Sequence, residues 1–381
     1  MNAPPGIKRQ PTGCRDGARG CRVLMSVDAV GGVWRYAMDL AGALHREGCT
    51  VVFAGFGPQP SVAQSKEASA IGTLVWLDAD LDWTGDGEEG LDRIPALIEA
   101  LVQRHAIDLV HLNAPSQAAG LDVRVPVIAV SHSCVVTWFE AVHGSPVPER
   151  WAWHERRNRR GFERADVVLA PSRSHAEALR RCYGPVARLE VIHNASCLPV
   201  ARHPKQGFAL AAARWWDEGK NGAALDRAAA QCRTPVLMAG ALTGPEGSQL
   251  AVTHARAPGE LPHAEVAALM ETAAIFVSPS LYEPFGLAAL EAARKGAALV
   301  LADIATYREL WDGAALFADP HDPAAIAAAI DRLADDPLLR SRLARQAGER
   351  AQQFSLEHQC RQALDVYARA LERMQRMEAA E

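Results

Sequence analysis

Residues 274–303 read AIFVSPSLYEPFGLAALEAARKGAALVLAD and decide the fold of the second half of the chain. Residues 275–277 are an apolar run that predicts a buried strand, and the Ser-Pro-Ser sequence after them ends it in a turn. Residues 287–295 predict an Ala/Leu-rich helix, and Gly296 is a suitable residue to close it. Residues 297–302 predict the next strand. The stretch is therefore a strand–loop–helix–strand unit whose loop ends where a helix begins.

The start of this predicted helix is a candidate anion site. The backbone N–H groups of Phe285, Gly286 and Leu287 have no partner within the helix and lie at the positive end of its dipole. A helix start of this kind binds anions, phosphate above all.

Two acidic residues flank the helix start, Glu283 in the loop and Glu291 within the helix. They could hold two parts of one ligand, because a carboxylate accepts hydrogen bonds from hydroxyl groups. The plain alternative is that Glu283 is an acid favoured by the helix dipole and that Glu291 is a solvated helix residue. The spacing alone favours this plain alternative.

The segment SPSLYEPFGLAALEAARKGAALVLAD resembles the donor-site signature of retaining GT-B glycosyltransferases of family 4. The likeness rests on Pro-Ser, on Glu-Pro-Phe-Gly-Leu and on both acids in register. It implies that Glu283 faces the sugar of a nucleotide-sugar, that Glu291 accepts from the nucleotide ribose, and that the loop amides hold the diphosphate. With the resemblance, the functional interpretation outweighs the plain one.

The composition is that of a globular protein of two domains. The chain has 381 residues, of which 49% are hydrophobic and 22% charged. A formal net charge of −5 argues against general affinity for nucleic acid. The eight cysteines are scattered without a C-x-x-C pair, which favours reduced thiols over disulfides or a zinc site. We find no transmembrane run and no secretory signal, and we expect a cytoplasmic protein.

Strands and helices alternate along the chain, which predicts an α/β protein with parallel, doubly wound sheets. The expected strands are residues 22–27, 50–55, 73–77, 108–112, 125–131, 166–170, 189–193, 208–213, 236–239, 250–254, 275–277, 297–302 and 315–318. The first helix follows a Gly-Gly turn, but the G-x-G-x-x-G pattern is absent, so we reject a dinucleotide cofactor.

Composition changes divide the chain into five parts. We expect a disordered tail at 1–20, a first Rossmann-like domain at 21–197, a linker at 198–207, a second Rossmann-like domain at 208–355 and an amphipathic C-terminal helix at 356–381. The resemblance implies the GT-B architecture, in which the two domains face each other across a cleft. It also implies that the first domain is the acceptor side, that the second binds the donor, and that the last helix crosses back to the first domain.

Arg214 and Lys220 follow the first predicted strand of the second domain, in the sequence AARWWDEGKNG. Two cations at this place could clamp a diphosphate, Arg by a bidentate contact and Lys as a point charge. Either residue alone would more simply be a solvated loop cation. The family resembled has an Arg and a Lys at this place and spacing, which implies that they neutralise the leaving diphosphate. Trp215, Trp216 and Asn221 depart from the family pattern.

Three further residues are candidates in the first half. Gly31 and Gly32 resemble the family's N-terminal glycine loop, which approaches donor phosphate or acceptor, although a Gly-Gly turn is also ordinary before a helix. His132 follows a strand at its C-terminal end, where open α/β sheets bind ligands. The family often has a His there, near the reacting sugar. A structural role remains an equal alternative for His132.

The segment from Arg150 to Arg164, RWAWHERRNRRGFER, is the only strong basic and aromatic cluster. It could contact an anionic lipid surface or a phosphorylated acceptor. The plain alternative, which we favour, is a solvated helix that leads into the next strand.

The residues and the resemblance together predict a retaining, metal-independent hexosyltransferase of glycan synthesis. It would move a sugar from a nucleoside-diphosphate-sugar, a UDP- or GDP-sugar, to the hydroxyl of a glycan, glycolipid or small molecule, without any cofactor. One alternative is a sugar-nucleotide epimerase or phosphorylase on the same architecture. Another is a non-catalytic sugar-nucleotide-binding subunit that regulates a partner. Donor hydrolysis would separate an enzyme from such a binder.

Overall fold

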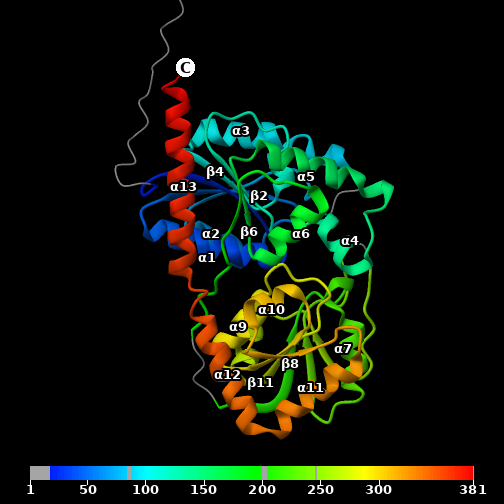
Figure 1. Cartoon of the computed structure of the whole chain (residues 1–381). Helices are drawn as coiled ribbons and strands as arrows, with labels where there is room; N and C mark the ends of the chain where they lie inside the picture. Colours follow the sequence, from blue (N-terminus) through cyan, green and yellow to red (C-terminus); the bar gives the residue numbers. More distant parts are fainter. Residues whose placement is uncertain (1–17, 84–86, 200–203, 245–246, 381) are drawn as a thin grey trace, which may run out of the picture.

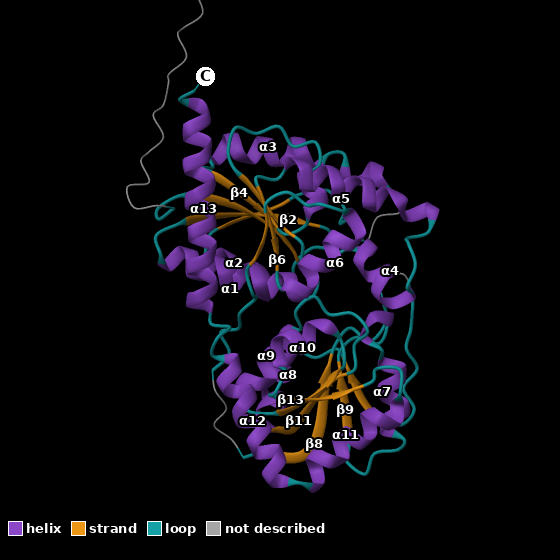
Figure 2. Cartoon of the chain, viewed as in Figure 1, coloured by secondary structure: helices purple, strands orange, loops and turns teal. Residues whose placement is uncertain are grey.

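The computed structural model describes residues 18–83, 87–199, 204–244 and 247–380. These residues form two parallel sheets, each with helices on both faces, and the two layered units stand one above the other in Figures 1 and 2. The predicted pair of α/β, Rossmann-like units is confirmed.

The first sheet has seven parallel strands in the order β3-β2-β1-β4-β5-β6-β7. They are β1 (Arg22–Asp28), β2 (Thr50–Phe56), β3 (Thr73–Trp76), β4 (Leu109–Leu112), β5 (Val127–Val130), β6 (Val167–Ala170) and β7 (Leu189–Val191). The helices of this unit are α1 (Gly32–Arg46), α2 (Val62–Ser69), η1 (Glu88–Leu91), α3 (Ile94–His105), η2 (Pro115–Ala118), α4 (Val135–His143), η3 (Glu149–Trp151), α5 (Ala152–Arg164) and α6 (Arg173–Tyr183).

The second sheet has six parallel strands in the order β10-β9-β8-β11-β12-β13. They are β8 (Gln206–Ala212), β9 (Val236–Ala239), β10 (Arg256–Gly259), β11 (Ala273–Ser278), β12 (Ala298–Ala302) and β13 (Ala315–Ala318). The helices are η4 (Glu218–Lys220), α7 (Gly222–Ala229), α8 (His263–Thr272), α9 (Leu287–Arg294), α10 (Ala305–Trp311), α11 (Pro323–Asp335), α12 (Pro337–Ala351) and α13 (Leu356–Glu378).

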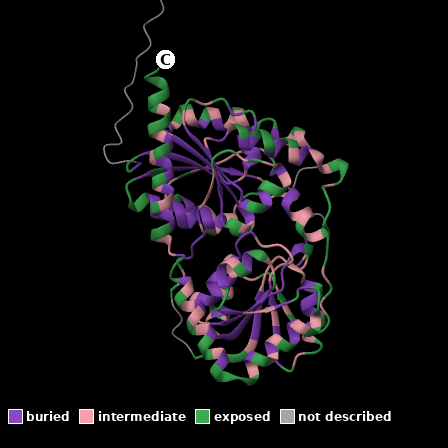
Figure 3. Cartoon of the chain, in the orientation of Figure 1, coloured by how far each residue is buried: buried purple, intermediate pink, exposed green. Residues whose placement is uncertain are grey.

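The central strands are buried on both faces, which explains why they appear in the sequence as continuous apolar runs. Every residue of β11 and of β12 is buried. Figure 3 shows buried residues along the strands of both sheets and exposed residues on the outward faces of the helices. Burial of these apolar surfaces is therefore the main driving force for each unit.

Both sheets change direction at their centres. In the first sheet the chain winds from β1 out to β3 and then returns to β4 beside β1; in the second it winds from β8 out to β10 and returns to β11 beside β8. Open α/β sheets bind ligands at the carboxyl ends of the strands beside such a reversal. The residues that follow β1, β4, β8 and β11 are therefore the places to look for a site.

The C-terminal helix α13 belongs by sequence to the second unit but packs on the first. Figure 1 shows it running along α1, and Tyr367 and Val366 lie in the same core cluster as Val23 and Leu40. The predicted crossing of the last helix back to the first domain is confirmed. None of the helices in the described ranges is both long enough and apolar enough to span a bilayer.

One predicted strand is wrong. Residues 250–254 form an irregular segment, because the Asp226 carboxylate accepts the backbone N–H groups of Thr253, His254 and Ala255 and so competes with a sheet ladder. The strand of this region is β10, which contains Pro258. Proline removes one ladder donor, which an edge strand such as β10 tolerates.

The ends of the expected domains differ in detail from the structure. Residues 1–17 of the expected tail and residues 200–203 of the expected linker lie outside the described residues. Residues 18–20 were expected in the disordered tail, but Ala18 is buried and Arg19 pairs with Glu47. The expected linker also overlaps β8, which begins at Gln206.

Candidate functional site

Lys220 and Glu283 form an ion pair beyond the carboxyl ends of β8 and β11. The Lys220 ammonium donates to Oε1 of Glu283 over 2.7 Å, and each side chain is only 15% exposed. Ser280 donates to the same carboxylate oxygen over 3.3 Å. The carbonyl of Gly219 accepts the N–H of Leu281 over 2.9 Å. Two loops that are distant in sequence are thus held as one surface.

The conformation and contacts of Asn221 explain why an asparagine can stand where the family pattern has another residue. Its backbone is left-handed, with φ of 57°, and Asn is among the few residues other than Gly that adopt this conformation readily. Its side-chain amide donates to the carbonyls of Pro279 and Pro320 over 3.0 and 2.7 Å. Asn221 therefore makes the turn that a glycine would make and also ties three loops together.

Arg214 reaches the glycine loop of the first unit. A Cβ atom added to Gly31 would lie 3.3 Å from a guanidinium nitrogen of Arg214. The guanidinium lies over the Trp216 ring, 5.4 Å from its centroid, and 3.6 Å from the Asp217 carboxylate. Trp216 and Asp217 therefore hold a cation against the opposite unit. Trp215 instead belongs to the core, where its indole donates to the carbonyl of Ala239.

The start of α9 has the features expected of an anion site. Gly286 has φ of 87°, and a Cβ there would lie 2.7 Å from the Tyr307 ring, so only glycine fits. Within the described residues, the N–H groups of Phe285, Gly286 and Leu287 donate to no protein acceptor. Buried backbone donors are nearly always paired. Because Phe285 and Gly286 are buried, these N–H groups are available to a ligand. Leu287 also lies near Gly32, whose added Cβ would be 3.5 Å from its Cδ1.

Glu291 is buried in α9 and, among the described residues, forms no hydrogen bond or ion pair with Lys220 or Glu283. Its Oε1 lies 3.6 Å from Nε2 of His263, the first residue of α8. The hydrogen bond to Glu291 raises the pKa of His263 above its usual value, and burial opposes this shift. Glu291 is thus not the solvated helix residue of the plain alternative.

His132 follows β5 and is held by one hydrogen bond. The amide of Asn113 donates to the carbonyl of Ser26 over 2.5 Å, which turns its oxygen towards Nε2 of His132 at 3.0 Å. Nε2 therefore carries the proton, and Nδ1 is left as an acceptor. Burial, with smaller contributions from His111 and His175, lowers the pKa of His132 to about 3. The imidazole is neutral at physiological pH.

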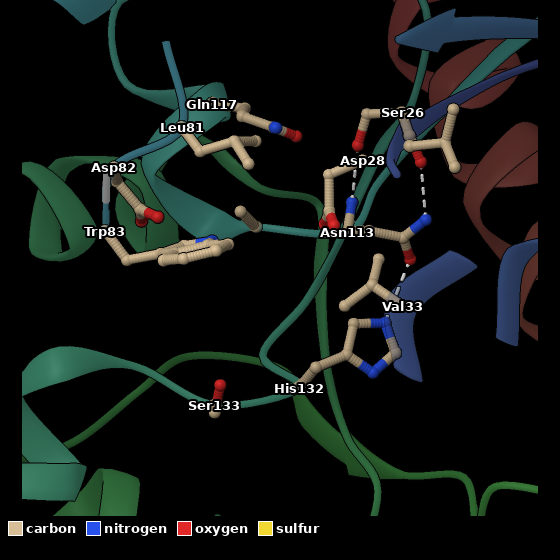
Figure 4. A pocket seen from close by; sticks show the side chains of 12 residues that line it. Ser26, Asp28, Val33, Leu81, Asp82, Trp83, Asn113, Gln117, His132 and Ser133 are labelled. Atoms are coloured by element: carbon tan, nitrogen blue, oxygen red, sulfur yellow. Dashed lines mark hydrogen bonds between the residues drawn. The ribbon is translucent and has the colours of Figure 1, made fainter. Parts of the chain in front are cut away.

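A pocket of about 60 Å³ adjoins His132 at the carboxyl ends of β1 and β4. Figure 4 shows Asp28 and Asn113 on one side of it, Asp82 and Trp83 on the other, and His132 beside Val33. Burial raises the pKa of Asp28 to about 6, although the N–H of Val30 and the charge of Arg214 act in the opposite direction.

The two units also make direct contacts beside a second pocket of about 150 Å³. Glu309 of α10 accepts the N–H groups of Arg173 and Ser174 at the start of α6, over 3.0 and 2.7 Å. The hydroxyls of Thr137 and Tyr282 lie 2.7 Å apart across the units. These contacts hold the second unit against the start of α6 and against α4 of the first unit.

Sequence reasoning missed several residues of the site. Asp28 and Asn113 end or follow central strands, so the rule on strand ends could have found them. Asp82, Trp83 and Gln117 lie in the connections after β3 and β4, where no sequence pattern marks them. His263 had no signal either, because its partner Glu291 is distant in sequence.

The basic segment from Arg150 to Arg164 is mostly engaged with the protein itself. Arg157 is 2% exposed and donates to the carbonyls of Ser116 and Leu91. Arg164 donates to the carbonyls of Leu121 and Val123. The remaining exposed arginines include Arg156 and Arg160, both of which face Glu88.

The described residues contain no group of three or more His, Cys, Asp or Glu side chains that could hold a metal ion.

Comparison with known proteins matches each half of the chain to a glycosyltransferase family model. Residues 30–195 match the family model described as Glycosyltransferase Family 4. Residues 249–353 match the model described as Glycosyl transferases group 1. A D-inositol 3-phosphate glycosyltransferase of a Nocardioides species is 41% identical over 108 residues, which are 28% of this chain and 24% of that protein. The chain thus matches about a quarter of the length of such curated relatives.

Solved structures share the fold along nearly the whole chain. Sucrose-phosphate synthase from Thermosynechococcus elongatus has a TM-score of 0.77 at 18% identity, over 95% of this chain and 100% of that one. Anabaena HepE in complex with UDP-glucose has a TM-score of 0.71 at 17% identity, over 91% and 99%. With the two parallel sheets, the α13 crossing and both family models in agreement, the chain belongs to the GT-B glycosyltransferases of family 4, also described as glycosyl transferases group 1.

Proposed function

We propose that the chain is a retaining hexosyltransferase that moves a sugar from a nucleoside-diphosphate-sugar to an acceptor hydroxyl. The observation that carries the proposal is the surface formed by the ends of the two sheets. The Lys220–Glu283 pair, Arg214 and the unpaired N–H groups at the start of α9 all belong to the second unit. Gly31 and Gly32 face Arg214 and Leu287 from the first unit.

The proposed roles follow from charge and position. Arg214, Lys220 and the N–H groups of Phe285, Gly286 and Leu287 stabilise the charge that develops on the leaving diphosphate, and such fixed electrostatics is usually the largest catalytic contribution. The Lys220 ammonium has three donors, of which one goes to Glu283, so two remain for phosphate oxygens.

The remaining residues are assigned to the sugar and the nucleoside. Glu283 orients the donor sugar, and Glu291 accepts from the ribose hydroxyls, with His263 holding its carboxylate. His132, neutral and with Nδ1 free to accept, lies near the reacting sugar. Gly31 and Gly32 allow the backbone of the first unit to approach the donor, because neither has a side chain to separate the two units.

A UDP-sugar is the donor we favour. Anabaena HepE, which shares the fold, was crystallised with UDP and with UDP-glucose. A GDP-sugar, which the sequence predicts equally, is the alternative donor. The cytoplasmic location and a membrane contact through the basic segment stay predictions, and the internal contacts of Arg157 and Arg164 do not favour the latter.

A thermal-shift panel of UDP-, GDP-, ADP- and dTDP-sugars tests the proposal. A ligand at 100 times its dissociation constant adds about 2.7 kcal/mol of stability, so the true donor should raise the melting temperature clearly. The matched control is Lys66→Ala, which removes an exposed lysine from α2. It should keep the shift, whereas Lys220→Ala should reduce it. If no nucleotide-sugar stabilises the protein, the proposal is wrong.

The retaining stereochemistry needs a separate measurement. The product of transfer from the identified donor should keep the anomeric configuration of the donor sugar, which the one-bond coupling of the anomeric carbon reports in an NMR spectrum recorded early in the reaction. An inverted product would reject the retaining mechanism and leave the glycosyltransferase assignment in place.

A further inference from the structure

The pocket beside His132 has an unusual charge for a transferase that handles phosphate. Its lining includes two carboxylates, Asp28 and Asp82, and neither Lys nor Arg. Its one imidazole, His132, is neutral at physiological pH. The cations of the proposed donor site lie on the second unit, so the two sides of the cleft differ in charge.

Each of the two carboxylates has an oxygen to offer. Asp28 accepts the N–H of Val30 over 2.8 Å through Oδ1, and Asp82 accepts the hydroxyl of Ser116 over 2.7 Å through Oδ2. In the described part of the chain, the other oxygen of each carboxylate accepts no hydrogen bond. Asp28 is only 8% exposed although one of its oxygens has no donor, and burial of a carboxylate is unfavourable.

Gln117 is the independent sign of a ligand. The residue is 6% exposed, and its Oε1 has no hydrogen-bond partner among the described residues. Figure 4 shows its amide directed into the space between Leu81 and Asp28. Buried polar atoms are nearly always hydrogen-bonded, so an acceptor left open inside a pocket points to a donor brought by a ligand.

The shape and chemistry of the pocket fit part of a sugar ring. A volume of about 60 Å³ holds roughly four water molecules, or a few hydroxyl groups, at about 15 Å³ each. The Trp83 indole forms one wall, and its flat apolar face suits the C–H face of a ring. The carboxylates and the Gln117 carbonyl accept hydrogen bonds, which hydroxyl groups can donate.

We propose that this pocket is the acceptor subsite and that it takes an uncharged sugar or polyol, with Asp28, Asp82 and Gln117 accepting its hydroxyl groups. The inference rests on the proposed glycosyltransferase function and names its acceptor class. A phosphorylated acceptor is disfavoured in this pocket, because its phosphate would lie beside two carboxylates, and Arg214, the cation whose charge reaches Asp28, is already paired with Asp217. The specificity therefore lies in what the pocket repels as well as in what it binds.

The test compares matched pairs of acceptors with the donor identified by thermal shift. The pairs are glucose and glucose 6-phosphate, mannose and mannose 6-phosphate, and inositol and inositol 3-phosphate. We expect kcat/KM for at least one uncharged member to exceed that of its phosphorylated partner about 10-fold or more. If a phosphorylated member is the better substrate of its pair, or if the protein hydrolyses the donor but glycosylates no uncharged member, the assignment is wrong.

Variants of the pocket separate this inference from the proposed function. Asp82→Asn should raise the acceptor KM about 10- to 100-fold, the effect of losing a hydrogen bond to a charged group, and should leave the donor KM unchanged. Asp28→Asn should act in the same way. The control Asp78→Asn alters a carboxylate that is 97% exposed and should change neither constant.

Two other outcomes have different meanings. A rise of the donor KM in Asp82→Asn, with the acceptor KM unchanged, would make the pocket part of the donor site and overturn the inference alone. Failure of every nucleotide-sugar to bind or to be hydrolysed would overturn the proposed function together with the acceptor assignment.

Discussion

Lys220 and Glu283 compensate each other's charge in a place where neither is well solvated. The 2.7 Å contact joins η4 to the loop before α9, and each side chain is largely removed from water. Removing one partner of such a pair leaves the other charge buried and uncompensated. The pair therefore fixes the position of the lysine that we assign to the diphosphate and of the carboxylate that we assign to the sugar.

We predict that Lys220→Ala and Arg214→Ala each lower kcat/KM about 10²- to 10³-fold, which corresponds to about 2.7–4 kcal/mol of lost transition-state stabilisation. For Arg214, whose side chain is 39% exposed, the loss of unfolding free energy measured in urea should be smaller than the loss of transition-state stabilisation. Lys66→Ala provides the control for loss of a lysine. Steady-state kinetics near the wild-type values in both site variants would contradict the diphosphate clamp.

We predict different effects for the two acids near the start of α9, Glu283 in the preceding loop and Glu291 within the helix. Glu283→Gln should impair transfer strongly and leave affinity for the free nucleoside diphosphate nearly intact. Glu291→Ala should weaken that affinity, because Glu291 pairs with His263 and is the carboxylate that we assign to the ribose. Calorimetric titration of the nucleoside diphosphate into both variants measures this difference. Equal losses of affinity would show that the two roles are not divided in this way.

We predict that transfer survives EDTA. The proposed site already has two cations and a helix start for the diphosphate, and magnesium requires several oxygen ligands in octahedral geometry. The measurement is the rate after exhaustive chelation and after addition of magnesium. Complete loss in EDTA that magnesium restores would reveal a metal site absent from our assignment.

The sequence predicted the elements that are defined by local pattern. The runs that became β9 and β13 were placed correctly because buried parallel strands are continuously apolar. The strand, helix and strand around α9 were placed from their apolar runs and from Gly296, which closes the helix and has φ of 76°. Residues 250–254 were misjudged because one side chain, Asp226, captures their backbone N–H groups, and no local pattern reveals such a distant partner.

The candidate site divides in the same way. Glu283, Glu291, Arg214 and Lys220 belong to compact motifs and could be found by resemblance. The partners that give them their properties, such as His263 and Trp216, are brought near only by the fold. Gln117 illustrates the limit, since an unpaired carbonyl oxygen inside a pocket can be recognised only when its surroundings are known.

We predict that the arginines of α5 differ in their contributions to the free energy of unfolding. Arg157→Ala should lower the free energy of unfolding by about 2–4 kcal/mol, because it leaves the carbonyls of Leu91 and Ser116 without their donor. Arg156→Ala, at a side chain that is 65% exposed, should change stability by less than about 0.5 kcal/mol. Urea unfolding measures both. Equal losses of unfolding free energy in Arg157→Ala and Arg156→Ala would show that Arg157 does not stabilise the fold.

A membrane contact should therefore be tested by changing only Arg156 and Arg160, by sedimentation with anionic vesicles at low and high salt.

The last prediction concerns Asp28, whose pKa burial raises from 3.8 to about 6. A carboxyl group whose pKa is higher in the folded state than in the unfolded state stabilises the fold only in its protonated form. Its contribution is fully present below the ordinary value and is lost as the pH rises through about 6, and the difference corresponds to about 3 kcal/mol. Asp28→Asn removes this ionisation but can still accept the N–H of Val30.

The variant should therefore be more stable than the wild type at pH 8, by up to about 3 kcal/mol, and the difference should vanish near pH 4. Urea unfolding across this pH range measures it. Ser26→Ala, next to the same strand end, is the control, since it alters no titrating group and should change stability equally at all pH values. A stability gain in Asp28→Asn together with a higher acceptor KM would mean that the buried charge is retained for binding at the expense of stability. The contrary result is a stability difference between Asp28→Asn and the wild type that is the same at pH 8 and at pH 4. That result would show that ionisation of Asp28 does not destabilise the folded protein.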